Sequence, residues 1–115
     1  MDKIYHITTN ENWSLAVDKG LYDFCALKTE GFIHCSTFSQ VVATANRFFK
    51  EADNLIVLEL KSDEIHSEIR FENLQVGDEK FPHIYGPVEL GAVVGIYKLT
   101  KNDRNLFSSL RKIER

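Results

Sequence analysis

Three of the four histidines lie in short stretches that are crowded with other hydrogen-bonding side chains. His6 stands in KIYHITT, two residues before Thr8. His34 opens the run HCST, and His83 shares the stretch FPHIYGP with Tyr85. An imidazole ring exchanges protons near neutral pH and can also hold a ligand by hydrogen bonds. These stretches are therefore candidates for acid–base chemistry or for binding.

Each of these residues also has an ordinary structural interpretation. A histidine inside a strand, such as His6, is often half-buried with one backbone partner, and Tyr85 can be a plain core aromatic. The fourth histidine, His66, lies in the polar stretch KSDEIHSE and is predicted to be solvated. His34 favours a functional role because it neighbours a predicted helix start, and the stretches of His34 and His83 are predicted to face one cleft.

The residues after His34 precede a long amphipathic segment, which predicts the start of a helix. Backbone N–H groups at a helix start bind phosphate or carboxylate groups, so Ser36 and Thr37 are candidate ligand contacts. The alternative is a capping box in which Thr37 and Gln40 exchange hydrogen bonds.

The sequence also has to be considered for metal binding and for cysteine chemistry. His34, Cys35 and His83 are potential zinc ligands, but neighbours on a strand point to opposite faces and no third ligand has a characteristic spacing. No metal site is therefore predicted, and a metal-assisted hydrolase is kept as a second alternative. Cys35 and Cys25 are predicted to be buried apolar residues rather than nucleophiles.

Three glutamates deserve comparison as partners of the histidines. Glu30 precedes the GFIHCST stretch, Glu72 shares a strand face with Arg70, and Glu89 stands just before the last apolar strand. A general base must approach a histidine or hydroxyl closely, and each of these carboxylates alone is more often solvated.

The apolar patterns predict the elements that position these residues. Strands are predicted at residues 3–8, 31–35, 54–60, 68–74 and 92–99. Helices are predicted from Asn10 to a stop at Gly20, over 38–52, and over a C-terminal segment with the stripe Leu106, Phe107, Leu110 and Ile113. The prolines of residues 81–87 predict a loop there. The pattern indicates one α+β domain over residues 1–115.

Composition excludes several classes of function. The formal net charge is −3 and the basic residues are scattered, so no nucleic acid partner is expected. No apolar run approaches the roughly 20 residues of a membrane span, and the N-terminus does not resemble a signal peptide. The expected location is the cytoplasm, and no oligomeric state is predicted.

Longer motifs point to a family. The stretches IYHIT, EGFIHCST and FPHIYGP, together with the intervening QV and TANRFF segments, resemble the bacterial family known as domain of unknown function 952. The resemblance runs from Ile4 to about Leu99. It implies a small ADP-ribosyltransferase-like fold, with split antiparallel or mixed sheets of about five or six strands and about three helices.

That resemblance implies roles for particular residues. His6 would contact the adenosine ribose of NAD, and the segment from His34 to Thr37 would line the nicotinamide side. The glutamate that stabilises the ribosyl cation would be Glu89 by chain order, with Glu72 second. Ile7 departs from the glycine that follows this histidine in ADP-ribosyltransferases.

Together these observations predict an NAD-binding or nucleotide-binding protein with a histidine-lined cleft, which transfers ribosyl or phosphoryl groups. The cofactor or substrate is expected to be NAD or a related nucleotide. The predicted catalytic residues are His34, His83 and Glu89, and the predicted substrate-binding residues are His6, Thr8, Ser36, Thr37 and Tyr85. The alternative is a non-catalytic binding or interaction module of the same fold.

Overall fold

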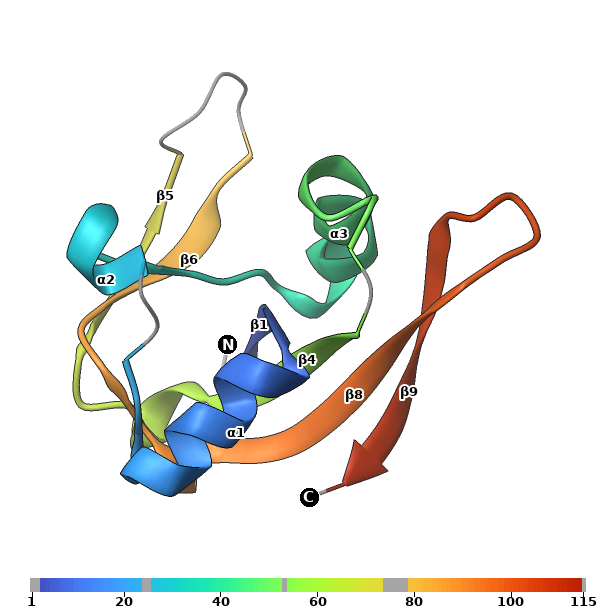
Figure 1. Ribbon diagram of the computed structural model, residues 1–115. Helices are drawn as coiled ribbons and strands as arrows, with labels where there is room; N and C mark the ends of the chain where they lie inside the picture. Colours follow the sequence, from blue (N-terminus) through green and yellow to red (C-terminus); the bar gives the residue numbers. More distant parts are fainter. Residues whose placement is uncertain (1–2, 24–25, 53, 74–78, 115) are drawn as a thin grey trace.

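The computed structural model describes residues 3–23, 26–52, 54–73 and 79–114 of the chain. In these ranges the chain forms antiparallel sheets with helices packed against them, so the predicted α+β class is confirmed (Figure 1). The largest sheet is four-stranded and contains β1 (Lys3–Thr9), β4 (Leu55–Lys61), β8 (Val93–Lys101) and β9 (Phe107–Glu114), in the order β1-β4-β8-β9.

Both faces of this sheet are covered. Strand β4 is buried from Leu55 to Leu60, which explains its almost unbroken apolar sequence. One face packs against helix α1 (Asn10–Lys19) and the smaller sheets, through residues that include Ile4, Leu58, Ile96, Trp13 and Ile84. The other face packs against helix α3 (Val41–Phe48), through residues that include Ile7, Val57, Leu99, Val41 and Ala45.

Helix α1 follows β1 directly and has clear end signals. Thr9, rather than the predicted Asn10, is its N-cap, and the Thr9 side chain accepts the Asn12 N–H at 3.1 Å. The helix ends as predicted at Gly20, which has φ 88° and donates its N–H to the Ala16 carbonyl.

Two smaller sheets complete the fold. The three-stranded sheet contains β3 (Ile33–His34), β6 (Phe81–Tyr85) and β5 (Glu68–Glu72), in the order β3-β6-β5. The two-stranded sheet pairs β2 (Leu21–Tyr22) with β7 (Val88–Glu89). Between these elements lie helix α2 (Ala26–Thr29) and 3-10 turns at Phe38–Gln40, Ser62–Glu64 and Leu90–Ala92.

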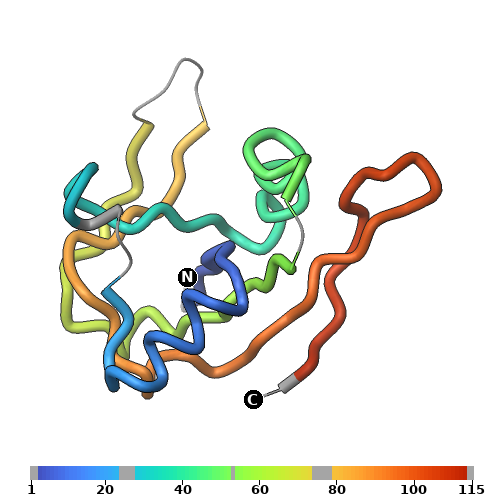
Figure 2. The backbone as a smooth tube through the Cα atoms, in the orientation of Figure 1, coloured from blue at the N-terminus to red at the C-terminus, as the bar shows by residue number. Residues whose placement is uncertain are grey.

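The predicted loop over residues 81–87 is wrong for its first five residues, because β6 is the middle strand of the three-stranded sheet. Pro82 has no N–H, and it lies where β3 ends. The Cys35 N–H donates to the Pro82 carbonyl at 3.0 Å, and the chain then leaves this sheet. Ser36 pairs instead with Tyr5 of β1 through two backbone hydrogen bonds of 2.7 and 2.8 Å. Figure 2 shows this segment running from the three-stranded sheet towards α3.

The predicted C-terminal helix is also wrong, because residues 107–114 form strand β9. A turn reverses the chain after β8: Asn102 Oδ1 accepts the N–H groups of Arg104 and Leu106, and Asn105 has φ 62°. The side chain of Asn46 in α3 then exchanges two hydrogen bonds of 2.8 Å with the Phe107 backbone. These pairings with β8 and α3 override the helical spacing of the apolar residues.

The helix predicted over 38–52 is shorter than expected. A 3-10 turn occupies Phe38–Gln40, and the α-helix spans Val41–Phe48. The predicted capping box is confirmed, with the Thr37 N–H donating to Gln40 Oε1 at 2.9 Å.

One close approach within the large sheet generates a stability prediction. Glu59 is only 6% exposed and faces Gly95 across the β4–β8 pair. A Cβ atom at residue 95 would lie 2.4 Å from Glu59 Oε1 and 3.2 Å from Glu59 Cβ. We expect Gly95→Ala to lower the free energy of unfolding by about 2 kcal/mol, measured by urea denaturation, because the carboxylate that accepts the Tyr5 hydroxyl must move.

The matched control is Gly91→Ala, where a Cβ atom meets nothing within 4 Å. It should change the free energy of unfolding by less than about 0.5 kcal/mol. Equal losses in the two variants would contradict the role given to the Glu59 contact.

Candidate functional site

The outer face of the three-stranded sheet gathers the predicted histidines. His34 in β3 pairs with His83 in β6, and His83 pairs with Arg70 in β5, so the three side chains share one face. By alternation this face also carries Phe81 and Tyr85 of β6. The opposite face carries Ile33 and Ile84, which are fully buried in the core. The burial of Ile33 and Ile84 on the inner face thus fixes which side chains of β3 and β6 point to the other face.

Glu72 is the carboxylate that meets the histidines. Its Oε1 atom lies 3.0 Å from His83 Nδ1 and also accepts the Tyr85 hydroxyl. An ionised carboxylate has no hydrogen to donate and can only accept hydrogen bonds. Nδ1 of His83 therefore carries the hydrogen in this contact. Two donors on one oxygen hold the Glu72 side chain in a fixed orientation.

These contacts change the proton affinity of the carboxyl group. The hydrogen bond from Tyr85, and secondarily that from His83, lowers the pKa of Glu72 below its ordinary value. The same contact with Glu72 raises the pKa of Tyr85. Glu72 is therefore a carboxylate at neutral pH, suited to facing positive charge and poorly suited to donating a proton.

A cavity of about 140 Å³ opens beside this cluster and is lined by Glu30, Phe32, His34, Glu72, Asn73, Phe81 and His83. We call it the histidine cavity. Its lining contains two carboxylates and neither lysine nor arginine among the described residues. The Phe81 ring lies 5.4 Å from the His34 ring, between centroids, and the Phe32 ring lies 4.3 Å from that of His83. The cavity is thus acidic and aromatic.

The two cavity histidines differ in what they can contact. His83 is 2% exposed, and its Nε2 atom is buried without a hydrogen-bond partner. The rings of Phe32 and His34, at 4.3 and 5.0 Å, pack against it. His34 is half-buried, and burial together with the neighbouring charge of His83 lowers its pKa to about 4. His34 is consequently neutral at pH 7 and is the more accessible of the two.

His6 and Thr8 lie behind this surface, in a buried hydrogen-bond chain. His6 Nδ1 lies 2.7 Å from the His34 carbonyl oxygen, and its Nε2 lies 2.7 Å from the Tyr22 hydroxyl. The Tyr22 hydroxyl lies 2.9 Å from Thr8 Oγ1, which also accepts the Asn12 amide at 3.3 Å. Burial is the main cause that lowers the pKa of His6 to about 4. Tyr22, which follows the helix stop at Gly20, was not predicted as a site residue.

The remaining predicted ligand contacts have partners within the protein. Ser36 is 2% exposed, and its hydroxyl lies 3.4 Å from that of Thr44. Thr37 belongs to the capping box with Gln40. Of the predicted site residues, His34 and His83 line the cavity and Tyr85 contacts its Glu72, while His6, Thr8, Ser36 and Thr37 lie outside the cavity lining.

Glu89, the predicted catalytic carboxylate, lies in a different place. It is in β7, where its Oε2 atom is 2.8 Å from Nδ1 of the exposed His66. It does not line the histidine cavity. Glu72 occupies the position beside His83, which the alternation of the stretch EIRFE could have indicated if residues 81–85 had been recognised as the neighbouring strand.

Cysteine chemistry and metal binding find little support in the described ranges. Cys35 is 1% exposed, and burial raises the pKa of its thiol, which agrees with the predicted buried apolar role. Cys25 lies outside the described residues. Among the residues that are described, no group of three or more His, Cys, Asp or Glu side chains could hold a metal ion.

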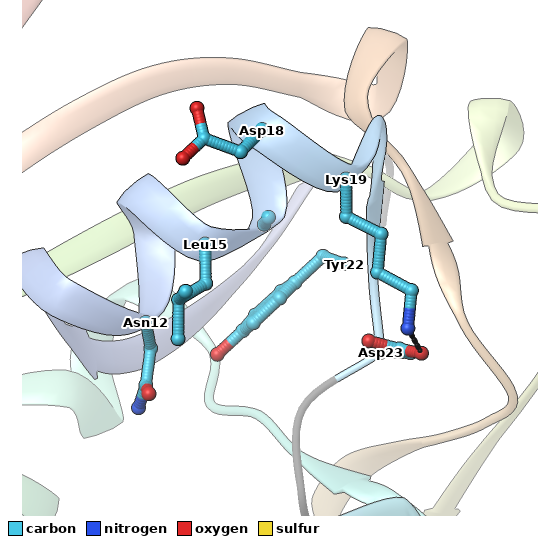
Figure 3. A pocket seen from close by; sticks show the side chains of 7 residues that line it. Asn12, Leu15, Asp18, Lys19, Tyr22 and Asp23 are labelled. Carbon is cyan, nitrogen blue, oxygen red and sulfur yellow. Dashed lines mark hydrogen bonds and ion pairs between the residues drawn. The ribbon is translucent and has the colours of Figure 1, made fainter.

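A larger pocket lies between α1 and β2. It has a volume of about 510 Å³ and is lined by Asn12, Leu15, Ala16, Asp18, Lys19, Tyr22 and Asp23 (Figure 3). We call it the α1–β2 pocket. Lys19 and Asp23 form an ion pair at its edge, and the Tyr22 hydroxyl points to the end near Asn12. Two of its lining residues, Tyr22 and Asn12, thus belong to the hydrogen-bond chain of His6.

Comparison with known proteins supports the motif-based resemblance. Residues 7–96 match the family described as protein of unknown function (DUF952). A crystal structure of protein CC0527 from Caulobacter crescentus is 25% identical with a TM-score of 0.80, over 92% of this chain and 93% of that one. The solution NMR structure of CC0527 is 26% identical with a TM-score of 0.72, over 94% and 93%. No curated protein matches the chain.

The matched region contains every residue of the histidine cavity. None of these matches is described as an ADP-ribosyltransferase, so that part of the resemblance stays a prediction. Among the described helices, none has the length and apolar character needed to cross a bilayer.

The buried histidine His6 predicts a loss of stability in mild acid. Its pKa is lowered from 6.5 to about 4 on folding, so between these values the unfolded chain binds a proton that the folded protein does not. The stabilisation that comes from keeping His6 neutral is therefore fully present above pH 6.5, and it is lost as the pH falls towards 4. At about 1.36 kcal/mol per pH unit, His6 accounts for roughly 3 kcal/mol.

This loss can be measured by urea denaturation at pH 7 and pH 4.5, in the wild type and in His6→Gln. The variant should be less stable at pH 7 but should lose less stability on acidification, because the titrating group is gone. If both proteins lose the same amount, His6 is not the source of the pH dependence.

Proposed function

Because the chain belongs to the DUF952 family, whose description names no reaction, we propose an activity from the site itself: cleavage or transfer at the ribosyl centre of NAD or a related nucleotide. The observation that carries the proposal is the ionised Glu72, held by His83 and Tyr85 at the edge of an acidic, aromatic cavity. A fixed carboxylate of this kind stabilises positive charge that develops in a transition state.

The lining of the histidine cavity favours ribosyl over phosphoryl chemistry. Glu30 and Glu72 repel a phosphate, and the described lining residues include neither lysine nor arginine. Arg70 lies on the same sheet face but is paired with Glu68. A nicotinamide ring is cationic in NAD, and the ribose becomes cationic as the ring leaves. Phe32 and Phe81 provide aromatic faces for such a ring.

In the hydrolytic form of the proposed reaction, the bond between ribose C1′ and the nicotinamide nitrogen breaks. Nicotinamide leaves with the bonding electron pair, and a water oxygen bonds to C1′ and releases its proton to solvent. Glu72 offsets the charge on the ribose, His83 and Tyr85 hold Glu72, and the neutral His34 contacts the ligand as a hydrogen-bonding group. Another nucleophile in place of water gives transfer.

The size of the cavity limits how much of the ligand it holds. Pockets for whole small molecules span about 300–1,000 Å³, whereas the histidine cavity has about 140 Å³. It fits one ring and the reacting bond, with the rest of the nucleotide outside. An ADP-ribosyltransferase-like arrangement is part of this proposal, and it is supported by the division of the strands into separate antiparallel sheets.

The test is release of nicotinamide from NAD, followed by chromatography, with wild type and Glu72→Gln. The substitution keeps the size and removes the charge. We expect kcat/KM to fall on the order of 100-fold, mainly through kcat, because the interaction is strongest in the transition state.

Two further variants sharpen this test. Glu64→Gln changes an exposed glutamate in the 3-10 turn after β4 and should leave turnover unchanged. Glu89→Gln separates the carboxylate suggested by chain order from the one beside His83, and it too should retain activity. Loss of activity with Glu89→Gln but not Glu72→Gln would overturn the assignment. Saturable binding of NAD without turnover would favour the non-catalytic alternative.

A further inference from the structure

We propose that His6 is a positioning residue for His34: together with Tyr22 it holds the backbone that presents the His34 ring to the histidine cavity. The inference rests on the proposed function for its catalytic consequence, but its structural part can be tested without turnover. It also gives His6 a role different from the ribose contact that the family resemblance implied.

The contacts of His6 leave neither of its ring nitrogens for a ligand. The side chain is 3% exposed, with Nδ1 at 2.7 Å from the His34 carbonyl and Nε2 at 2.7 Å from the Tyr22 hydroxyl. A carbonyl oxygen only accepts, so Nδ1 carries the hydrogen. In the neutral ring Nε2 then carries no hydrogen, and it faces the Tyr22 hydroxyl at 2.7 Å.

The carbonyl that His6 holds lies at a critical point of the chain. His34 is the last residue of β3, and the next two residues bond to different sheets: Cys35 to Pro82, and Ser36 to Tyr5. The peptide unit after His34 therefore spans the change from one sheet to the other. His6 belongs to the four-stranded sheet, and its hydrogen bond to the His34 carbonyl fixes the orientation of this peptide unit.

The orientation of this unit matters because of what the His34 ring contacts. The ring lies 5.0 Å from the ring of His83 and 5.4 Å from that of Phe81, between centroids. It packs over the histidine whose Nδ1 atom holds Glu72. A displaced His34 ring would change the shape of the cavity and its packing against the His83 ring. Small displacements of reacting groups slow a reaction considerably.

The same chain reaches a second cavity. Tyr22 lines the α1–β2 pocket, and Asn12 of that pocket also bonds Thr8 (Figure 3). From Asn12 the contacts run through Thr8, Tyr22 and His6 to the His34 carbonyl, each between 2.7 and 3.3 Å. The position of His34 is thus fixed by groups that lie in the wall of another pocket.

The test uses two substitutions of His6 and one of Tyr22. His6→Asn keeps a donor near the place of Nδ1, whereas His6→Gln moves its amide to the place of Nε2. Tyr22→Phe removes only the hydroxyl. Ring ¹⁵N and ¹H resonances of His34 and His83 are recorded for each protein by NMR, with thermal unfolding as a measure of folding.

We expect His6→Gln to shift the ring resonances of both His34 and His83, His6→Asn to restore them towards wild type, and Tyr22→Phe to give a smaller shift. With NAD turnover, His6→Gln should lower kcat on the order of tenfold with KM changed less than about twofold, and His6→Asn should recover most of it.

The outcomes separate this inference from the proposed function. If the wild type does not turn over NAD but the ring resonances respond as expected, the ribosyl proposal fails and the positioning role stands. If the resonances of His34 and His83 are unchanged in folded His6→Gln and Tyr22→Phe proteins, the positioning role is overturned. A change confined to KM would instead place His6 in contact with the ligand.

Discussion

The passage of the chain between two sheets at residues 34–36 is the constraint on which the candidate site depends. Two adjacent residues make backbone hydrogen bonds to two different sheets: Cys35 to Pro82, and Ser36 to Tyr5. Pro82 lacks the N–H that would complete its pair, so β3 ends there without leaving a donor unpaired. This break joins the three-stranded sheet to the edge of the four-stranded sheet, and it places His34 at the junction.

The elements that could be predicted from the sequence were those decided by local residue patterns, such as a continuous apolar run or a glycine at a helix end. The buried run of β4 and the end of α1 at Gly20 follow from local rules that tertiary structure does not disturb. The C-terminal strand and β6 were missed for the opposite reason. The apolar spacing of residues 106–113 fits a helix, but pairing with β8 and the bonds to Asn46 decide the outcome. At β6 the prolines suggested a loop. The missing N–H of Pro82 affects only the pairing with β3, however, and β6 still pairs with β5 along its length.

The candidate site shows the same division. The two motifs could be recognised as halves of one site because histidine and tyrosine are conspicuous, and the structure brings His34, His83 and Tyr85 together. The role of Glu72 depended on knowing that β5 and β6 are neighbours, which is a long-range pairing. The strand that carries His6 was predicted, yet the contacts of His6 with Tyr22 and the His34 carbonyl depend on the packing of α1 and on the sheet junction.

Strand β9 has a consequence for how this protein behaves in a crowded solution. It covers the edge of β8, whose nine residues would otherwise present a row of open backbone donors and acceptors to other chains. The outer edge that β9 itself offers is different in character, since Arg111 and Lys112 are both exposed on it. Positive charges on a sheet edge oppose the stacking of one copy's strand on another's. The charges of β9 thereby disfavour edge-to-edge pairing of this sheet, and the strand lies outside residues 7–96, which match the family.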